Sequence, residues 1–219
     1  MKVYILRHAQ TDMNKAKLIQ GRLDIPINEE GVAQAENRRD SVIKSGLSFD
    51  VIFTSPLERA IQTTEIVSGV NRSEFIIDER LAELCFGEIE GLNYRSLPFP
   101  QSNFFDSPKD YIPAKGGETF EELESRLTSF FTDLTSDDFN KFKYSAKDDN
   151  DFSILITSHG TVMHSILKKL LELDYDDFWT PPASNCSLFE VQLSNQEYKL
   201  IGAYDLDGNL EADMHKWTK

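Results

Sequence analysis

The chain has 219 residues, of which 40% are hydrophobic and 11% aromatic, so it can bury one substantial core without needing a second independent domain. Its net charge of −14 opposes binding to nucleic acid or to anionic lipid. No apolar run is long enough to cross a bilayer, and the first residues do not resemble a signal peptide. We therefore expect one cytoplasmic domain over residues 1–219 that binds neither nucleic acid nor membranes.

The cysteines and the charge also limit the kinds of site that the chain can carry. Cys85 and Cys186 lie far apart, and neither belongs to a cluster of cysteine and histidine residues. We expect no disulfide framework and no metal site. Because the whole chain is acidic, an anionic substrate would need a small and concentrated positive pocket.

Three short apolar segments end abruptly in polar residues and are followed by a helical pattern. They are residues 3–6 before Arg7-His8, residues 50–54 before Ser55-Pro56, and residues 152–157 before Ser158-His159-Gly160. This order is typical of buried parallel strands in an α/β fold. We predict a three-layer α/β/α sandwich with a mostly parallel central sheet, and we expect the polar residues to converge beyond the carboxyl ends of the strands.

Apolar periodicity and capping residues predict four helices. They cover about residues 28–45, 55–69, 119–134 and 161–173. In the second helix, Ser55 is the expected N-cap and Pro56 the first helical residue. Two later segments, 187–193 and 198–205, predict an antiparallel hairpin.

Residues 92–117 interrupt this pattern with four prolines and several aromatic residues. The mixture predicts a packed insert or lid subdomain rather than a flexible linker. Its aromatic rings either contact a substrate with a stackable surface or form the core of the lid itself, and the second interpretation is favoured. Residues 136–151 are charged and poor in aliphatic residues, so we expect a mobile surface loop there.

The predicted sheet brings two arginines and two histidines to one edge. Arg7 and His8 follow the first strand, Arg59 lies one turn into the second helix, and His159 ends the third strand. Guanidinium groups bind phosphate oxygens through paired, charged hydrogen bonds. Neutral imidazole is a competent nucleophile toward phosphorus. The group therefore predicts phosphoryl chemistry, for which a general acid is still needed at the leaving oxygen.

Five sequence blocks occur in an order that is typical of one known family. They are Leu6-Arg7-His8-Ala9-Gln10-Thr11 with Asn14, Gln20-Gly21 and Asp24; Ser55-Pro56-Leu57-Glu58-Arg59-Ala60; residues 81–91 with Glu83; Gly116-Gly117-Glu118-Thr119 with Arg126; and Ser158-His159-Gly160. Together they resemble the histidine phosphatase (phosphoglycerate mutase-like) superfamily. Ala9 departs from the pattern, since the family usually has glycine after the histidine.

The resemblance implies a role for each matched residue. It implies that His8 accepts the phosphoryl group and that Glu83 protonates the leaving oxygen. It implies further that phosphate is held by Arg7, Asn14, Arg59 and His159, and that Gln20 and Gly21 contact the substrate. No metal or cofactor is implied. Because Glu83 can donate only in its protonated form, we expect the rate to be highest at acidic pH.

The resemblance leaves the fate of the phosphoryl group to be decided. Mutases of the family carry arginine, tyrosine and lysine where this chain has Leu84, Phe86 and Tyr94, and the loss of these groups favours a phosphatase acting on a small phosphorylated metabolite. The alternatives are a 2,3-bisphosphoglycerate-dependent phosphoglycerate mutase and a module that binds phosphorylated ligands without turnover.

Three smaller points stay open at this stage. A homodimer is left open as the assembly. Arg22, Arg95 and Lys109 are candidates for contacts to a second anionic group of the substrate. His164 has no context that suggests chemistry, and we interpret it as an ordinary residue of the helix after Ser158.

Overall fold

The computed structural model describes residues 1–136, 139, 152–180, 183–194 and 197–211. Most of the loop predicted for residues 136–151 therefore lies outside the described residues. The described strands form one sheet in the order β3-β2-β4-β1-β5-β6-β7. They are β1 (Lys2–Arg7), β2 (Val51–Thr54), β3 (Ile76–Ile77), β4 (Ser153–Ser158), β5 (Leu188–Ser194), β6 (Glu197–Tyr204) and β7 (Leu210–Glu211).

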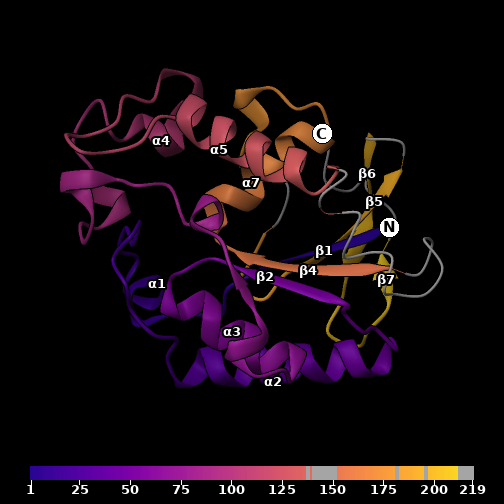
Figure 1. The fold of residues 1–219 in the computed structure, drawn as a ribbon. Helices are drawn as coiled ribbons and strands as arrows, with labels where there is room; N and C mark the ends of the chain where they lie inside the picture. Colours follow the sequence, from indigo (N-terminus) through magenta and orange to yellow (C-terminus); the bar gives the residue numbers. More distant parts are fainter. Residues whose placement is uncertain (137–138, 140–151, 181–182, 195–196, 212–219) are drawn as a thin grey trace.

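Helices cover both faces of this sheet (Figure 1). They are α1 (Asp12–Ala16), α2 (Glu29–Lys44), α3 (Glu58–Ser68), α4 (Asn103–Asp106), α5 (Phe120–Asp133) and α7 (Gly160–Leu170). Helices α2 and α3 lie on one face, and α5 and α7 lie on the other. The three-layer α/β/α prediction is confirmed. Among the described residues, no helix combines the length and the apolar character that spanning a bilayer demands.

The sheet is mixed, and its parallel part carries the predicted strands. Strands β3, β2, β4 and β1 pair in parallel, whereas β5, β6 and β7 continue the sheet by antiparallel pairing. Because β6 is antiparallel to β5, it runs in the same direction as β1. Most strands therefore point the same way, as the sequence predicted, and the hairpin of β5 and β6 is also found where it was expected.

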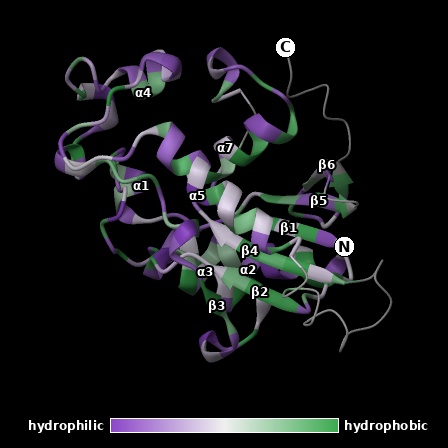
Figure 2. Ribbon diagram, turned by 45° about the horizontal axis from the view of Figure 1, so that its top comes forward, coloured by the Kyte–Doolittle hydropathy of each residue, from purple (hydrophilic) through white to green (hydrophobic). Residues whose placement is uncertain are grey.

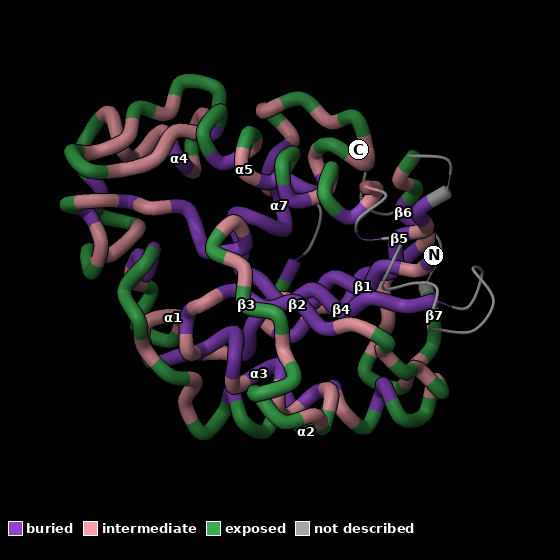
Figure 3. The backbone as a smooth tube through the Cα atoms, in the orientation of Figure 1, coloured by how far each residue is buried: buried purple, intermediate pink, exposed green. Residues whose placement is uncertain are grey.

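Alternating side chains of β1 fill two separate cores. Val3 and Ile5 belong to the cluster that includes α5 and α7, and Tyr4 and Leu6 belong to the cluster on the side of α2. This alternation follows from the two-residue repeat of a strand. The central strands are accordingly hydrophobic in Figure 2 and buried in Figure 3.

The predicted start of the second helix is wrong. Helix α3 begins at Glu58, and its N-cap residue Leu57 makes no capping bond through its side chain. Ser55 Oγ accepts the N–H of Leu57 at 3.3 Å and lies 2.6 Å from His159 Nε2. The Ser55 hydroxyl therefore does not cap the helix. It stabilises the turn that precedes the helix and contacts His159.

Other helix ends follow local chemistry more directly. The Asn28 side chain caps α2, and Thr119 forms a reciprocal capping box with Glu122 at the start of α5. Helix α7 ends at Leu170 rather than at 173. Strands β3 and β7 have only two residues each, which is too short for the sequence periodicity to reveal.

The segment of residues 92–117 consists of α4 and short 3-10 turns. Phe104, at the start of this segment's helix, is 1% exposed. Its ring contacts those of Phe86, Tyr111, Phe120 and Trp179 at centroid distances between 4.7 and 5.6 Å. The segment is therefore attached to α5 and to the chain before β5 by aromatic packing.

Candidate active site

The carboxyl ends of β1 and β4 bring the first predicted residues together. The two strands pair in parallel, with Arg7 opposite Ser158, and the N–H of His8 donates to the Ser158 carbonyl at 2.9 Å. As a result the rings of His8 and His159 lie 5.1 Å apart between centroids. The convergence expected from the sheet argument is present in the structure.

His8 is buried and held as a neutral ring. Its Nδ1 lies 2.7 Å from the carbonyl oxygen of Ala9. Because a carbonyl only accepts hydrogen bonds, Nδ1 carries the hydrogen and Nε2 keeps a free lone pair. Burial, and then the positive charges of Arg59 and Arg7, hold the pKa of His8 well below its ordinary value. The imidazole is therefore unprotonated and nucleophilic at neutral pH.

Arg59 is the fully buried cation of the site. Its guanidinium donates to His159 Nδ1 at 3.2 Å, to the Leu23 carbonyl at 2.8 Å and to the Gly21 carbonyl at 2.6 Å. An arginine has five N–H groups, so two remain for a ligand. Burial lowers the pKa of Arg59 to about 10, against the opposing charge of Glu83, and the group stays charged at neutral pH.

His159 is fixed by protein atoms on both sides of its ring. Since Nδ1 accepts from Arg59, the hydrogen is on Nε2, which donates to Ser55 Oγ. Burial and the charge of Arg59 hold the pKa of His159 well below its ordinary value. His159 lies behind Arg59 and does not belong to the lining of the cavity described below.

Arg7 has a buried donor with no partner. Its Nη1 donates to the Ala183 carbonyl, whereas Nε is buried and has no hydrogen-bond partner among the described residues. A Cβ added to Gly160 would lie 3.3 Å from the Arg7 guanidinium carbon, so a larger residue there would have to displace the guanidinium by a few tenths of an ångström. Buried orphan donors are rare in folded proteins, and here the orphan N–H belongs to a residue that lines the cavity.

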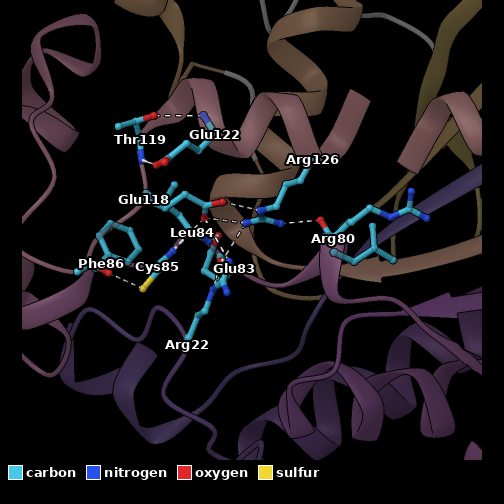
Figure 4. A network of polar contacts seen from close by, with 12 residues as sticks. Arg22, Arg80, Glu83, Leu84, Cys85, Phe86, Glu118, Thr119, Glu122 and Arg126 are labelled. Atoms are coloured by element: carbon cyan, nitrogen blue, oxygen red, sulfur yellow. Dashed lines mark hydrogen bonds and ion pairs between the residues drawn. The ribbon is translucent and has the colours of Figure 1, made fainter. Parts of the chain in front are cut away.

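Glu83 reaches the same place from the loop that follows β3. It is 8% exposed, and its Oε1 accepts the N–H of Leu84 at 2.9 Å. Its Oε2 accepts the N–H of Thr161, in the first turn of α7, at 3.1 Å. The carboxyl group is thus held in a fixed orientation beside the strand ends (Figure 4).

Asn14, Gln20 and Gly21 lie on the segment that follows β1. Asn14 Oδ1 accepts the N–H of Thr11 at 3.1 Å, and within the described chain its Nδ2 has no hydrogen-bond partner. Gln20 Oε1 accepts from Thr11 Oγ1 at 2.8 Å. Gly21 has a φ of +51°, and a Cβ there would lie 2.0 Å from Glu90 Oε1, so this backbone position favours glycine.

A cavity of about 260 Å³ joins these groups. Its lining includes seven of the eight predicted residues, namely Arg7, His8, Asn14, Gln20, Gly21, Arg59 and Glu83. A larger hollow of about 740 Å³ lies between α5 and α7 and contains none of them. The candidate active site is therefore the smaller cavity.

Sequence reasoning missed His164, which lines this cavity. Burial, together with the charge of Arg7, lowers the pKa of His164 to about 4, so the ring is neutral. One signal could have indicated its place. His164 lies four residues after Gly160 in the same helix, and residues with this spacing share a helix face.

The three candidates for a second anionic contact lie outside the lining of the cavity. Arg22 donates to the Glu83 carbonyl and to Glu118 at 3.4 and 3.5 Å. Lys109 pairs with Asp176 at 3.0 Å, and Arg95 lies over the ring of Tyr94. Arg22 and Lys109 are thus engaged with other parts of the protein.

A parallel strand pair that ends in an Arg-His and a His-Gly beside one cationic cavity is the arrangement expected of the histidine phosphatase kind of protein. Residues 3–205 match the profile of the histidine phosphatase superfamily (branch 1). The chain belongs to this superfamily, as the sequence blocks indicated.

Individual relatives have different described activities. The chain is 28% identical over 204 residues to "Putative phosphoserine phosphatase 2" of Hydrogenobacter thermophilus, covering 91% of this chain and 93% of that protein. It is 30% identical over 207 residues to "Probable phosphoglycerate mutase GpmB" of Proteus mirabilis, covering 92% and 89%. The fold also resembles the crystal structure of the alpha-ribazole phosphatase of Shigella flexneri, with a TM-score of 0.76, 22% identity and coverage of 96% and 100%.

Proposed function

We propose that the protein is a phosphatase that hydrolyses a small phosphorylated metabolite through a phosphohistidine on His8. The observation that carries the proposal is His8 itself, a neutral ring whose free Nε2 belongs to a cavity lined by two arginines and a carboxyl group. Relatives described as phosphatases of small metabolites support the same reaction class.

In the first step, His8 Nε2 attacks phosphorus and the bond from phosphorus to the ester oxygen breaks. Arg7 Nε, the two remaining N–H groups of Arg59 and Asn14 Nδ2 bind the phosphoryl oxygens, with His159 holding Arg59 in place. Glu83 gives its proton to the departing oxygen. The fixed cations stabilise negative charge on the equatorial oxygens at the transition state, which supplies most of the catalysis in such transfers.

In the second step, water attacks the phosphorus of phosphohistidine. The bond from phosphorus to Nε2 breaks, Glu83 takes a proton from the water, and inorganic phosphate leaves. His8 returns to its neutral form with Nδ1 still bound to the Ala9 carbonyl. The groups that bound the phosphoryl oxygens in the first step serve again, so the site needs no rearrangement between the steps.

We further propose an acid-phosphatase type of reaction that requires no metal ion. The low pKa of His8 supports the first part, because the nucleophile stays unprotonated in weak acid. The four named donors are sufficient to hold a phosphoryl group, which supports the second part. The rate should peak below neutral pH and should be unchanged by EDTA.

Water is favoured over a second substrate as the acceptor. Leu84 is fully buried and Phe86 packs edge-on against Phe104 at 4.7 Å, so neither position offers a charged group to a doubly phosphorylated intermediate. A mutase remains the alternative, since one relative is described as one. Incubation with 3-phosphoglycerate, with and without 2,3-bisphosphoglycerate, should release free phosphate without isomerisation.

The decisive test is turnover of p-nitrophenyl phosphate by the wild type and by His8→Ala. We expect wild-type activity, its loss by several orders of magnitude in the variant, and an acid-labile ³²P label on the wild type alone. Lys109→Ala, on the surface, serves as the matched control and should retain activity. A wild type that binds phosphate but turns over no phosphomonoester would instead support the binding module.

The cytoplasmic location and the homodimer stay predictions of the sequence.

A further inference from the structure

The cavity has two chemically different ends. One end holds the cations and His8. At the other, the half-buried rings of Tyr94, Phe105 and Trp179 line the wall together with His164. Tyr94 and Phe105 lie 5.3 Å apart between centroids, and Phe105 and Trp179 lie 5.5 Å apart at 30°. This second end is an aromatic surface next to the phosphate end.

The indole of Trp179 and the imidazole of His164 carry no charge, and His164 Nδ1 is buried without a hydrogen-bond partner among the described residues. Trp179 Nε1 donates to the Phe104 carbonyl at 3.0 Å. The indole N–H is therefore already engaged, and a ligand would contact the carbon atoms of the ring. The low pKa of His164 keeps its ring neutral. Besides Arg7 and Arg59, the cationic residue of the described lining is Lys17, an exposed residue. The wall is therefore poorly suited to a carboxylate or a second phosphate.

We propose that the leaving alcohol of the natural substrate is uncharged and carries a flat ring that stacks on Phe105 and Trp179. This inference rests on the proposed function and specifies its substrate class. The aromatic rings of the insert then have both roles that the sequence left open. The buried ring of Phe104 belongs to the core as well as to the lining, and the half-buried rings of Phe105 and Tyr94 line the cavity.

The test compares two esters of primary alcohols, 2-phenylethyl phosphate and O-phosphoserine. We expect a kcat/KM that is higher for the aryl ester by a factor on the order of ten, the scale of one aromatic stacking contact. Trp179→Leu should remove this preference by raising KM for the aryl ester alone. Phe99→Leu is the control, because Phe99 is an aromatic residue of the same insert that is 81% exposed and outside the lining.

Equal rates for both esters, or a preference for phosphoserine that Lys17→Gln removes, would overturn the substrate class while leaving the phosphatase reaction intact. If the wild type hydrolyses neither ester nor p-nitrophenyl phosphate, the proposed function itself fails.

A separate observation concerns how Glu83 is held. The loop that carries it contacts a half-buried ion pair between Glu118, just before α5, and Arg126 within α5 (Figure 4). Arg126 Nε lies 2.7 Å from Glu118 Oε1, and Nη2 lies 3.0 Å from Oε2. The side chains are only 14% and 11% exposed. Such a paired arrangement is geometrically specific.

This ion pair holds the main chain on both sides of the Glu83 side chain. Arg126 donates to the carbonyls of Arg80 at 2.5 Å and Glu83 at 3.3 Å. Glu118 Oε2 accepts the N–H of Cys85 at 3.2 Å, and the Glu118 N–H donates to the Cys85 carbonyl at 2.7 Å. The loop has no strand or α-helix of its own between Ala82 and Phe86, so these contacts largely determine its path.

The opposite charges of Glu118 and Arg126 neutralise each other in this contact. Burial acts to raise the pKa of the Glu118 carboxyl, but the hydrogen bonds and charge of Arg126 outweigh it and the net shift is downward. Glu118 is therefore an anion throughout the mildly acidic range. Neither Glu118 nor Arg126 lines the cavity.

We infer that Glu118 and Arg126 are positioning residues that hold the Glu83 carboxyl where it can protonate the leaving oxygen. This second inference also rests on the proposed function. Glu83 protonates the leaving oxygen in the first step, which kcat/KM reports, so weakening the pair should lower kcat/KM only where the leaving group needs a proton.

Leaving-group dependence tests this role. An alkyl phosphate needs the proton, whereas p-nitrophenolate leaves without one near neutral pH. In Glu118→Gln we expect kcat/KM for 2-phenylethyl phosphate to fall on the order of tenfold, with kcat/KM for p-nitrophenyl phosphate within about twofold of wild type. When Glu83 is already replaced by Gln, Glu118→Gln should not change the ratio of the two kcat/KM values any further. The effects of two residues that act through one group are not additive.

Glu122→Gln is the matched control, because Glu122 contacts Thr119 in the capping box next to the pair but not the Glu83 loop. We expect Glu122→Gln to perturb the start of α5 without changing the ratio of kcat/KM for the two esters. A Glu118→Gln variant that loses both activities equally, or neither, overturns the positioning role. If the wild type itself hydrolyses neither ester, the proposed function is contradicted.

Discussion

The two ends of the cavity are built by different means. At the phosphate end, Arg7, His8 and His159 stand where the parallel register of β1 and β4 puts them, and hydrogen bonds to neighbouring groups fix each side chain. The other end, which we call the alcohol end because the leaving alcohol would lie there, is formed by the aromatic wall and the Glu83 loop. The Glu83 loop and the insert have little regular structure and are held by an ion pair and by aromatic packing. In the proposed reaction, the residues at the strand ends carry out the chemistry, and the irregular segments determine which ester reacts.

Removing a cation from the phosphate end should give the largest effect. We expect Arg59→Gln to lower kcat/KM for every phosphomonoester by about 10² to 10³, since a preorganised donor at the transition state is lost. Kinetics on an aryl and an alkyl ester would check this. Arg39→Gln, which removes a guanidinium contact to the Ile66 carbonyl outside the cavity, should leave both rates unchanged. A loss confined to one ester would contradict the division into two ends.

His164, at the junction of the two ends, should make stability depend on pH. Its folded-state pKa of about 4 lies below the ordinary 6.5, so the unfolded chain binds more protons between these values. The contribution of the neutral His164 ring to the free energy of unfolding is complete above pH 6.5 and is lost as the pH falls toward 4. We expect wild type to lose about 2 to 3 kcal/mol more than His164→Gln between pH 7 and 4.5, measured by urea unfolding. Parallel pH profiles would refute the buried neutral ring.

A methyl group beside Arg7 should have a smaller effect on the phosphate end. In Gly160→Ala the new Cβ would lie 3.3 Å from the guanidinium, which must shift by a few tenths of an ångström. We expect about a tenfold lower kcat/KM on all esters. Alanine favours a helix more than glycine does, so the unfolding free energy should hold or rise. Unchanged activity would mean that Arg7 tolerates displacement.

The strand pattern was sufficient to bring Arg7, His8 and His159 together, because each of them follows a recognisable strand, whereas Asn14, Gln20, Gly21 and Glu83 were named through the family resemblance. Arg7 and His8 end an apolar segment, and the lining contains seven of the eight residues that were named. The sequence was insufficient for Ser55, whose serine-proline pattern is that of a helix N-cap. The hydroxyl instead contacts His159, more than a hundred residues away, and no local pattern records such a contact.

The alcohol end was less predictable for a related reason. The resemblance named Glu83. It did not reveal that Arg126, 43 positions later in the chain, donates a hydrogen bond to the Glu83 carbonyl. Trp179 and Phe104 belong to segments 75 residues apart. Rings and charges on irregular segments carry no periodicity, so their pairing becomes visible only once the chain is folded. His164 was overlooked because its neighbours in the cavity come from such segments.

The smallest predicted effect asks whether charge or packing attaches the insert. Lys109 pairs with Asp176 at 3.0 Å, but the side chains are 54% and 68% exposed, and exposed pairs rarely contribute measurably. We expect Lys109→Met to leave both the urea midpoint and the preference for an aryl ester unchanged. Phe104→Leu, which trims the buried ring beside Trp179, should lower both. If Lys109→Met alone reduced the preference, the alcohol end would depend on surface charge, and the contrast with the rigid phosphate end would have to be drawn differently.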